Sequence, residues 1–288
     1  MLDHLFHTTE PQLTQPTQLT IAVLGAGAMG SAIGRALSDA GARVLTPLEG
    51  RSEASTTRAR EADMEDASIE ALASCDFILS IVPPGVAVET AQRMTSVLTQ
   101  AAQKPVYIDC NAINPDTVNT ITRVLEPTGA PFVDGAIIGA PTDPKVYLSV
   151  QHAARAGVLN DQGLNVRVLD GLLGAASALK MSYAGITKGL TALGSAMSFA
   201  AMRNGAPDAL MSELAESQPA LAQWLANNVP RMPPKAYRWV AEMEEIAAFI
   251  GDDFAEHRIY EGAADLYARL AKDKDATGAH ERFFDPSK

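Results

Sequence analysis

The sequence predicts an α/β protein of two domains, a doubly wound parallel sheet followed by an all-helical domain. Strand and helix signals alternate over residues 19–174, as in repeated βαβ units, which build parallel sheets. Residues 175–288 are rich in Ala, Leu, Met and Glu with helical spacing. With 288 residues and 47% hydrophobic composition, the chain is long enough for two such domains. We expect residues 1–18 to form a mobile tail.

The strands and helices of the first domain are predicted from apolar runs and from the prolines and glycines that bound them. Residues 77–82 are apolar on both faces and stop at Pro83-Pro84, as expected of a central parallel strand. Pro115 opens a helix at its first turn. The predicted strands are 20–24, 43–46, 77–82, 105–109, 132–134, 146–150 and 165–169. The predicted helices run from the glycine loop to residue 40 and over 52–61, 69–73, 87–101 and 115–125.

A glycine pattern joins the first strand to the first helix. Gly25 permits a tight turn, Gly27 lets the backbone approach a pyrophosphate, and Gly30 lets the helix lie close to the strand. G-x-G-x-x-G alone is a weak signal, but here the strand before it and the helix after it are both present. The pattern predicts a Rossmann-type dinucleotide site in which the helix start faces the phosphates, with Ala28 and Met29 completing the loop.

The loop after the second strand bears on which dinucleotide binds. An acidic residue there binds a ribose 2′-hydroxyl, whereas an arginine receives a 2′-phosphate. Glu49 therefore favours NAD, whereas Arg51 favours NADP. Arg51 and Ser52, with Arg58 further along, favour NADP over the alternative, NAD. The competing interpretation is that Arg51 is a surface residue paired with Glu49.

Two further loops follow predicted strands, where ligands of open α/β sheets bind. The rigid turn at Val82 and Pro83 either covers the middle of the cofactor or simply ends a strand. In the segment 109–115, Asn111 and a helix start offer amide and N–H groups to an anionic substrate, although Asn114 would equally serve as a helix cap. Small residues around Gly139 leave room for a ligand or form a flexible connection.

The segment 174–188 contains a lysine among small and apolar residues. On a helix, Lys180 shares its face with Tyr183, Ala184 and Thr187. Desolvation there would lower the lysine pKa and make Lys180 a useful proton donor and acceptor. Composition alone favours a surface lysine with its stem packed on apolar residues.

Composition excludes several classes of function. A formal net charge of −11 opposes binding to nucleic acid. Cys75 and Cys110 have no metal-ligand spacing, so we predict reduced thiols, no metal site and a cytoplasmic protein. The apolar stretch 77–88 is interrupted by proline and is shorter than the ~20 residues of a membrane span, so no membrane association is expected.

These motifs, in this order, resemble the β-hydroxyacid dehydrogenase family, which includes 3-hydroxyisobutyrate and 6-phosphogluconate dehydrogenases. The glycine loop resembles its cofactor loop, 109–115 and 134–139 its two substrate loops, and 174–180 its catalytic helix. The resemblance implies that Lys180 is the general acid/base for a small anionic substrate. It also implies a homodimer formed through the C-terminal helical domain.

The chain departs from the family pattern at several places. Asn111-Ala112 stands where the family commonly has Ser-Thr, and Gly139-Ala140 where it has Gly-Gly. Ala184 replaces the asparagine that follows the lysine, so a substrate hydrogen bond would come from Tyr183, Thr187 or elsewhere. Residues 230–247 replace the usual lysine-aspartate helix and resemble a branch with a poorly characterised helical domain.

The cations of this replaced segment have two interpretations. They are Arg231, Lys235 and Arg238. In the first interpretation one of them binds a substrate carboxylate. In the second they pair with nearby acidic residues along the helix, namely Glu242, Glu244 and Glu245.

The leading hypothesis is an NAD(P)-dependent oxidoreductase that interconverts a small 3-hydroxy acid and its 3-oxo acid or semialdehyde. A second hypothesis is an imine reductase on the same scaffold, but the presence of Lys180 argues against it. A cofactor-binding sensor without turnover is the third.

Overall fold

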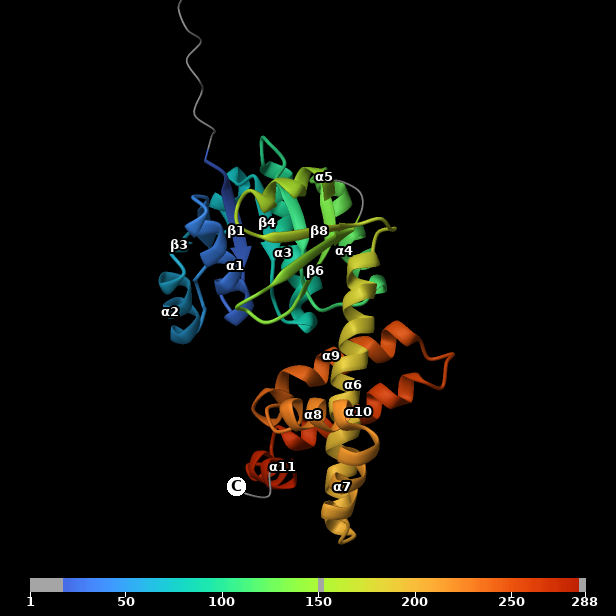
Figure 1. Ribbon diagram of the computed structural model, residues 1–288. Coiled ribbons are helices and arrows are strands. Elements are labelled where there is room, and N and C mark those ends of the chain that lie inside the picture. Colours follow the sequence, from blue (N-terminus) through green and yellow to red (C-terminus); the bar gives the residue numbers. More distant parts are fainter. Residues whose placement is uncertain (1–17, 150–152, 285–288) are drawn as a thin grey trace, which may run out of the picture.

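The computed structural model describes residues 18–149 and 153–284. The tail expected over residues 1–18 lies outside this part of the chain except for Gln18, and so does the last residue of the strand expected at 146–150. An α/β domain is followed by helices alone in the described residues, which confirms the predicted fold class (Figure 1).

The sheet has eight strands in the order β3-β2-β1-β4-β5-β6-β7-β8. All neighbouring pairs are parallel except β6 and β7, which are antiparallel. The strands are β1 (Thr20–Leu24), β2 (Arg43–Thr46), β3 (Glu65–Asp66), β4 (Phe77–Ser80), β5 (Val106–Asp109), β6 (Phe132–Ile138), β7 (Lys145–Ser149) and β8 (Asn165–Leu169).

Four strands correct the sequence prediction. β6 continues to Ile138 through residues that were expected to form a loop, and β4 ends at Ser80 rather than at Val82. The wholly parallel sheet is wrong at β7, because the connection 139–144 is too short for the crossover of a dozen or more residues that a parallel strand needs. β3 was not predicted, since its two residues are both exposed and carry no apolar pattern.

Helices cover both faces of the sheet. Alternate residues of β1 point to opposite faces of the sheet. Ile21 and Val23 pack into one apolar core, and Ala22 and Leu24 pack into the other. Helix α1 (Ala28–Asp39) contributes to the first core, and α3 (Ala87–Gln100) and α4 (Pro115–Leu125) to the second. The remaining elements are α2 (Glu53–Glu61), η1 (Glu70–Ser74), η2 (Pro84–Val86), η3 (Glu126–Thr128), α5 (Ala153–Ala156) and η4 (Gly157–Asn160).

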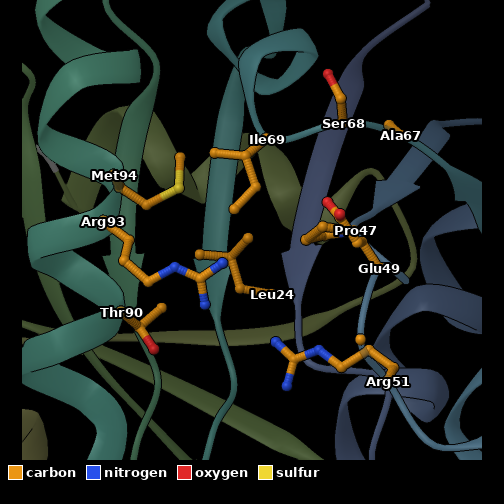
Figure 2. A pocket seen from close by; sticks show the side chains of 11 residues that line it. Leu24, Pro47, Glu49, Arg51, Ala67, Ser68, Ile69, Thr90, Arg93 and Met94 are labelled. Atoms are coloured by element: carbon orange, nitrogen blue, oxygen red, sulfur yellow. The ribbon is translucent and has the colours of Figure 1, made fainter.

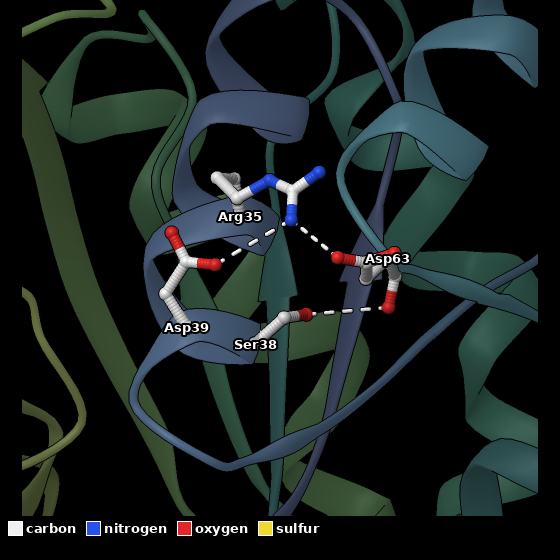
Figure 3. Close-up of polar contacts among 4 residues, drawn as sticks. All are labelled: Arg35, Ser38, Asp39 and Asp63. Atoms are coloured by element: carbon white, nitrogen blue, oxygen red, sulfur yellow. Dashed lines mark hydrogen bonds and ion pairs between the residues drawn. The ribbon is translucent and has the colours of Figure 1, made fainter.

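Polar contacts tie α1 to the turn before β3 (Figure 3). Arg35 pairs with Asp63 and, at 3.4 Å, with Asp39 one turn along the helix. The Ser38 hydroxyl donates to the Asp63 carbonyl at 3.3 Å, and Asp63 has a left-handed backbone with φ +52°. All of these groups are exposed, so they orient the turn more than they stabilise the fold.

The second part of the chain is built on α6 (Ala175–Arg203), which begins beside the sheet and runs through the helical part (Figure 1). Helices α9 (Ala236–Ile250) and α10 (His257–Leu270) pack on it around the buried side chains of Met181, Met243 and Tyr267. The other elements are α7 (Pro207–Ser217), α8 (Pro219–Asn228), η5 (Pro233–Lys235) and α11 (Ala276–Phe284). None of the described helices is long and apolar enough to cross a membrane.

Candidate active site

The glycine loop has the geometry of a phosphate cradle. Gly25 has φ +102°, and a Cβ there would lie 2.5 Å from the Ile81 carbonyl oxygen. A Cβ on Gly30 would lie 1.9 Å from the Gly25 carbonyl oxygen, so this position admits only glycine without a shift of the backbone. At Gly27, the residue that precedes α1, a Cβ would meet nothing within 4 Å. The open space at Gly27 and the free N–H groups of the helix start fit a pyrophosphate.

A pocket of about 320 Å³ lies beside the end of β1, between the loop after β2 and helix α3 (Figure 2). Arg51 and Arg93 extend their guanidinium groups into it from opposite sides, with Leu24 between them. Thr90, from α3, adds a hydroxyl. Glu49 also lines this pocket, and no ion pair joins it to Arg51 in the described residues. Two cations facing one cavity suit a doubly charged phosphate better than an uncharged ribose.

The other residues expected near this end of the cofactor have local structural contacts. Ser52 caps α2, and its hydroxyl oxygen accepts from the Ser55 N–H at 3.3 Å. Arg58 donates from Nε to the Ala26 carbonyl at 3.1 Å and so joins α2 to the glycine loop. Ala28 is exposed and Met29 half-buried at the start of α1.

The turn after β4 and the loop after β5 are joined by one side chain. Asn111 is 2% exposed, and its Oδ1 accepts from the Val82 N–H at 2.7 Å. Its Nδ2 donates to Ser80 and to Asp109. Both ends of the Asn111 amide are therefore occupied by the protein, and the turn that exposes Pro83 is fixed to the loop.

The start of α6 is held by a buried carboxylate of the sheet. Asp134 on β6 accepts from the N–H groups of Ala176 and Ser177 at 3.1 and 3.2 Å and from the Ser177 hydroxyl at 2.6 Å. Ser149 on β7 donates to the same carboxylate at 2.8 Å. Burial raises the pKa of Asp134, and these hydrogen bonds oppose the rise. The interaction fixes the first turn of α6 against the carboxyl end of the sheet.

Lys180 follows one turn after this anchor, so it lies on the side of α6 that faces the strand ends. Burial lowers its pKa to about 8, against smaller opposing effects of Cys110 and Asp109 at the end of β5. Asp109 pairs in register with Asp134 on the neighbouring strand. Burial raises the pKa of Asp109 to about 7, and Asn111 and Lys180 oppose this shift. The strand ends thus bring an ammonium group and two buried carboxyl groups into one site.

The other predicted substrate residues are less enclosed. Tyr183 is 52% exposed, and the Thr187 hydroxyl donates to the Tyr183 carbonyl at 2.9 Å. Gly139 is exposed in the turn between β6 and β7, where φ is +115° and a Cβ would lie 2.5 Å from the Asp143 carbonyl oxygen. The structure therefore gives Gly139 a conformational role in this turn.

The cations of the segment 230–247 are exposed and lack the pairs that helical spacing suggested. Arg231, Lys235 and Arg238 are all exposed. Glu242 instead contacts Lys188 on α6. The ring centroid of Trp239 lies 5.2 Å from the Lys188 Nζ. Glu245 accepts from the backbone and side-chain N–H groups of Asn114, each at 2.8 Å.

The comparisons with known proteins match both parts of the chain. Residues 20–145 match the NAD binding domain of 6-phosphogluconate dehydrogenase, and residues 201–270 match a domain of unknown function, DUF1932. The conserved protein MTH1747, of unknown function and described as structurally similar to 3-hydroxyacid dehydrogenases, is 28% identical with a TM-score of 0.70, covering 91% of this chain and 99% of that one. The chain thus joins an NAD binding domain of the 6-phosphogluconate dehydrogenase type to a DUF1932 domain. These matches identify an NAD(P)-dependent dehydrogenase that is similar to the 3-hydroxyacid dehydrogenases.

Two further similarities each cover more than two thirds of the chain. An uncharacterised 28.5 kDa protein of Methanothermus fervidus is 27% identical over 203 residues, which cover 69% of this chain and 78% of that protein. The 3-hydroxyisobutyrate dehydrogenase of Mycobacterium tuberculosis, solved with L-serine, is 19% identical with a TM-score of 0.65, covering 92% of this chain and 98% of that one.

Three residues of the candidate site were not found from the sequence. Arg93 sits in the middle of an amphipathic helix, where an exposed arginine carries no signal. Glu245 reaches Asn114 across 131 residues of sequence. Asp134 had a usable signal, because an aspartate beside strand-forming apolar residues is unusual, but its partner at the helix start could not be inferred.

Two glycine substitutions separate folding from cofactor binding. We expect Gly30→Ala to lower the melting temperature strongly, because its Cβ would overlap the Gly25 carbonyl oxygen. Gly27→Ala should leave the melting temperature within a few degrees of the original, because the added methyl group meets open space. It should nevertheless weaken dinucleotide binding at least about tenfold, since the methyl group occupies the phosphate position. Thermal unfolding and fluorescence titration with NADPH measure the two effects, and unchanged affinity in Gly27→Ala would contradict this assignment of the cradle.

Proposed function

We propose that the protein is an NADP-dependent oxidoreductase that interconverts a small 3-hydroxy acid and its 3-oxo acid or semialdehyde. The observation that carries the proposal is the placement of Lys180, with a pKa lowered to about 8, one turn beyond a helix start anchored on the strand ends. Such an amine changes protonation state near neutral pH, as a general acid/base must.

The residues of the chain divide the work of the reaction. A bound nicotinamide would supply the hydride acceptor for oxidation of the substrate carbinol and the hydride donor for reduction of the carbonyl. The neutral Lys180 Nζ takes the proton of the substrate hydroxyl during oxidation, and the ammonium form returns it during reduction. Asp134 holds in place the helix that carries this amine.

A small anionic substrate is the best fit to the site. Lys180 supplies positive charge at the strand ends. The distant structural neighbour from Mycobacterium tuberculosis was solved with L-serine, a small molecule that carries both a 3-hydroxyl and a carboxylate. We propose that Tyr183 and Thr187, on the helix that carries Lys180, border the substrate in place of the asparagine that the family has at position 184.

NADP is the proposed cofactor because Arg51 and Arg93 face the same pocket. One guanidinium beside Glu49 would leave the choice between NADP and NAD open, but two guanidinium groups favour a 2′-phosphate. Distant neighbours bind either form: one imine reductase from Myxococcus stipitatus was solved with NADP⁺, and a variant with NAD⁺.

We propose that the working form is a homodimer formed through α6. Apolar side chains follow the helix at alternating spacings of three and four residues: Tyr183, Ile186, Leu190, Leu193 and Met197. Four of these are between 51% and 69% exposed, with Leu190 less so. This spacing is that of a coiled-coil seam, so the stripe is complementary to a second copy of itself. An adjoining apolar pocket of about 220 Å³ would extend the interface.

A cytoplasmic location is also proposed. The described residues contain two cysteines, Cys75 and Cys110, and both are buried free thiols. Free thiols are typical of a reducing compartment.

The pH dependence of the reaction tests the role of Lys180. For oxidation of a 3-hydroxy acid, kcat/KM should rise with pH and level off above about 8, because the neutral amine is the base. For reduction it should fall above about 8, because the ammonium form is then lost. Lys180→Ala should lower kcat by roughly 10²- to 10⁴-fold in both directions, and Lys180→Arg should not restore it, because arginine stays charged.

Initial rates on hydroxy acids, oxo acids and cyclic imines supply the contrary outcomes. Reduction of imines that survives Lys180→Ala would favour an imine reductase. Tight NADPH binding without turnover across the panel would favour a sensor.

Cofactor preference tests the two arginines. Arg51→Ala and Arg93→Ala should each weaken NADPH binding about 10- to 100-fold, the range expected for losing a hydrogen bond to a charged group, with little change for NADH. Arg60→Ala is the matched control, because Arg60 is exposed on α2 and does not line the pocket. Loss of NADH affinity in Glu49→Ala, with no effect of Arg51→Ala, would instead assign NAD.

The dimer is tested by one charge in the α6 stripe. Leu193→Glu should convert the dimer to monomer, since the stripe would bring two such carboxylates into an apolar seam. Val168→Glu is the control, because Val168 is similarly exposed but lies on β8. Sedimentation equilibrium measures the mass, and a dimer that survives Leu193→Glu would contradict this interface.

A further inference from the structure

Two carboxylates, one from each domain, accept hydrogen bonds from the other domain. Asp134 of the sheet accepts hydrogen bonds from the first turn of α6, as described above. Glu245, on α9 of the helical part, accepts from the residue that begins α4 of the sheet domain. The two helix starts are adjacent, because a Cβ on Gly174 would lie 3.1 Å from the Pro115 Cβ. Each domain thus supplies an anion to a helix start of the other.

The Glu245 contact is specific and partly shielded from water. One oxygen, Oε2, accepts from the Asn114 N–H and from Asn114 Nδ2, both at 2.8 Å, with the Thr117 hydroxyl at 3.5 Å. The Asn114 Oδ1 meanwhile accepts from the N–H groups of Asp116 and Thr117 at 2.9 and 3.0 Å. Asn114 therefore caps α4 with one end of its amide and binds the other domain with the other end.

The contact continues toward the reacting groups. Asn114 closes the loop that begins at Asp109, and within this loop Asn111 holds the Val82 N–H at 2.7 Å. Val82 begins the turn that carries Pro83, and α9 itself packs against the following residues of η2. A shift of the loop would therefore move both the residues beside Lys180 and the turn at the end of β4.

We propose that Glu245 is a positioning residue for the reaction. Its carboxylate holds the loop 110–114 and the turn at Val82 in register with Lys180, although it touches neither substrate nor cofactor. This inference rests on the proposed function for its catalytic readout and on the interdomain contact for its structural one. In enzymes a misplacement of about 1 Å caused by a remote mutation can cost 10²-fold in rate.

The test compares two substitutions of one side chain in the full-length protein. Glu245→Ala removes the acceptor, and we expect kcat to fall roughly 10- to 100-fold while the affinity for NADPH stays within about threefold of the original. Glu245→Gln keeps an oxygen that accepts from both N–H groups of Asn114, so it should restore kcat to within a few-fold. Glu244→Ala is the control, because Glu244 is exposed on the same helix.

Amide hydrogen exchange with NADPH bound gives a readout that needs no turnover. In Glu245→Ala, exchange should rise about tenfold or more at Asn114, because its N–H loses a hydrogen bond to a charged group. Exchange should also rise at Val82, because its N–H is bound by Asn111 in the loop that Glu245 no longer holds. Glu245→Gln should show neither change. Faster exchange at Asn114 alone, or an unchanged kcat in Glu245→Ala, would overturn the inference. An inactive original protein whose exchange responds as expected would refute the proposed reaction and leave the positioning of the loop established.

Discussion

The position of Lys180, the candidate catalytic residue, depends on the Asp134 carboxylate at the start of α6. Taking this carboxylate out of water is unfavourable, and burial accordingly raises its pKa. Four hydrogen bonds from the protein offset the cost: two backbone N–H groups of α6, the Ser177 hydroxyl and the Ser149 hydroxyl. A satisfied buried network of this kind has one arrangement of low energy, so it fixes the helix in rotation as well as in position. Lys180 takes its place relative to the strand ends from that constraint.

The sheet topology supplies part of this anchor. Ser149 lies opposite Asp134 in register because β7 returns antiparallel to β6. A parallel strand after a long crossover would have a different register, which would not bring Ser149 opposite Asp134. The short connection around Gly139 therefore matters for the site, since it sets the direction of β7 and with it the last donor to Asp134.

The sequence was informative where a single residue type is required by local geometry. Gly25 and Gly30 are fixed by contacts within a few residues or with the adjacent strand, so the pattern of glycines predicted their surroundings correctly. Lys180 stood out because a lysine is unusual among small apolar residues. The sequence did not predict the direction of β7, the common pocket of Arg51 and Arg93, or the contact of Glu245 with Asn114. Each of these depends on how elements distant in sequence pack, and no local preference encodes it.

The acidic net charge of the chain is compatible with anionic ligands, because charge acts over short distances in salt solution. The net charge of −11 is spread over the whole molecule, and the Debye length at physiological ionic strength is about 8 Å. Recognition is therefore set by nearby groups, which here are the start of α1, the two guanidinium groups and the Lys180 ammonium. Lys188 adds little to this local charge, because Glu242 contacts it directly. A ligand small enough to enter the site therefore meets these positive groups at short range, where the net charge of the whole molecule has little effect.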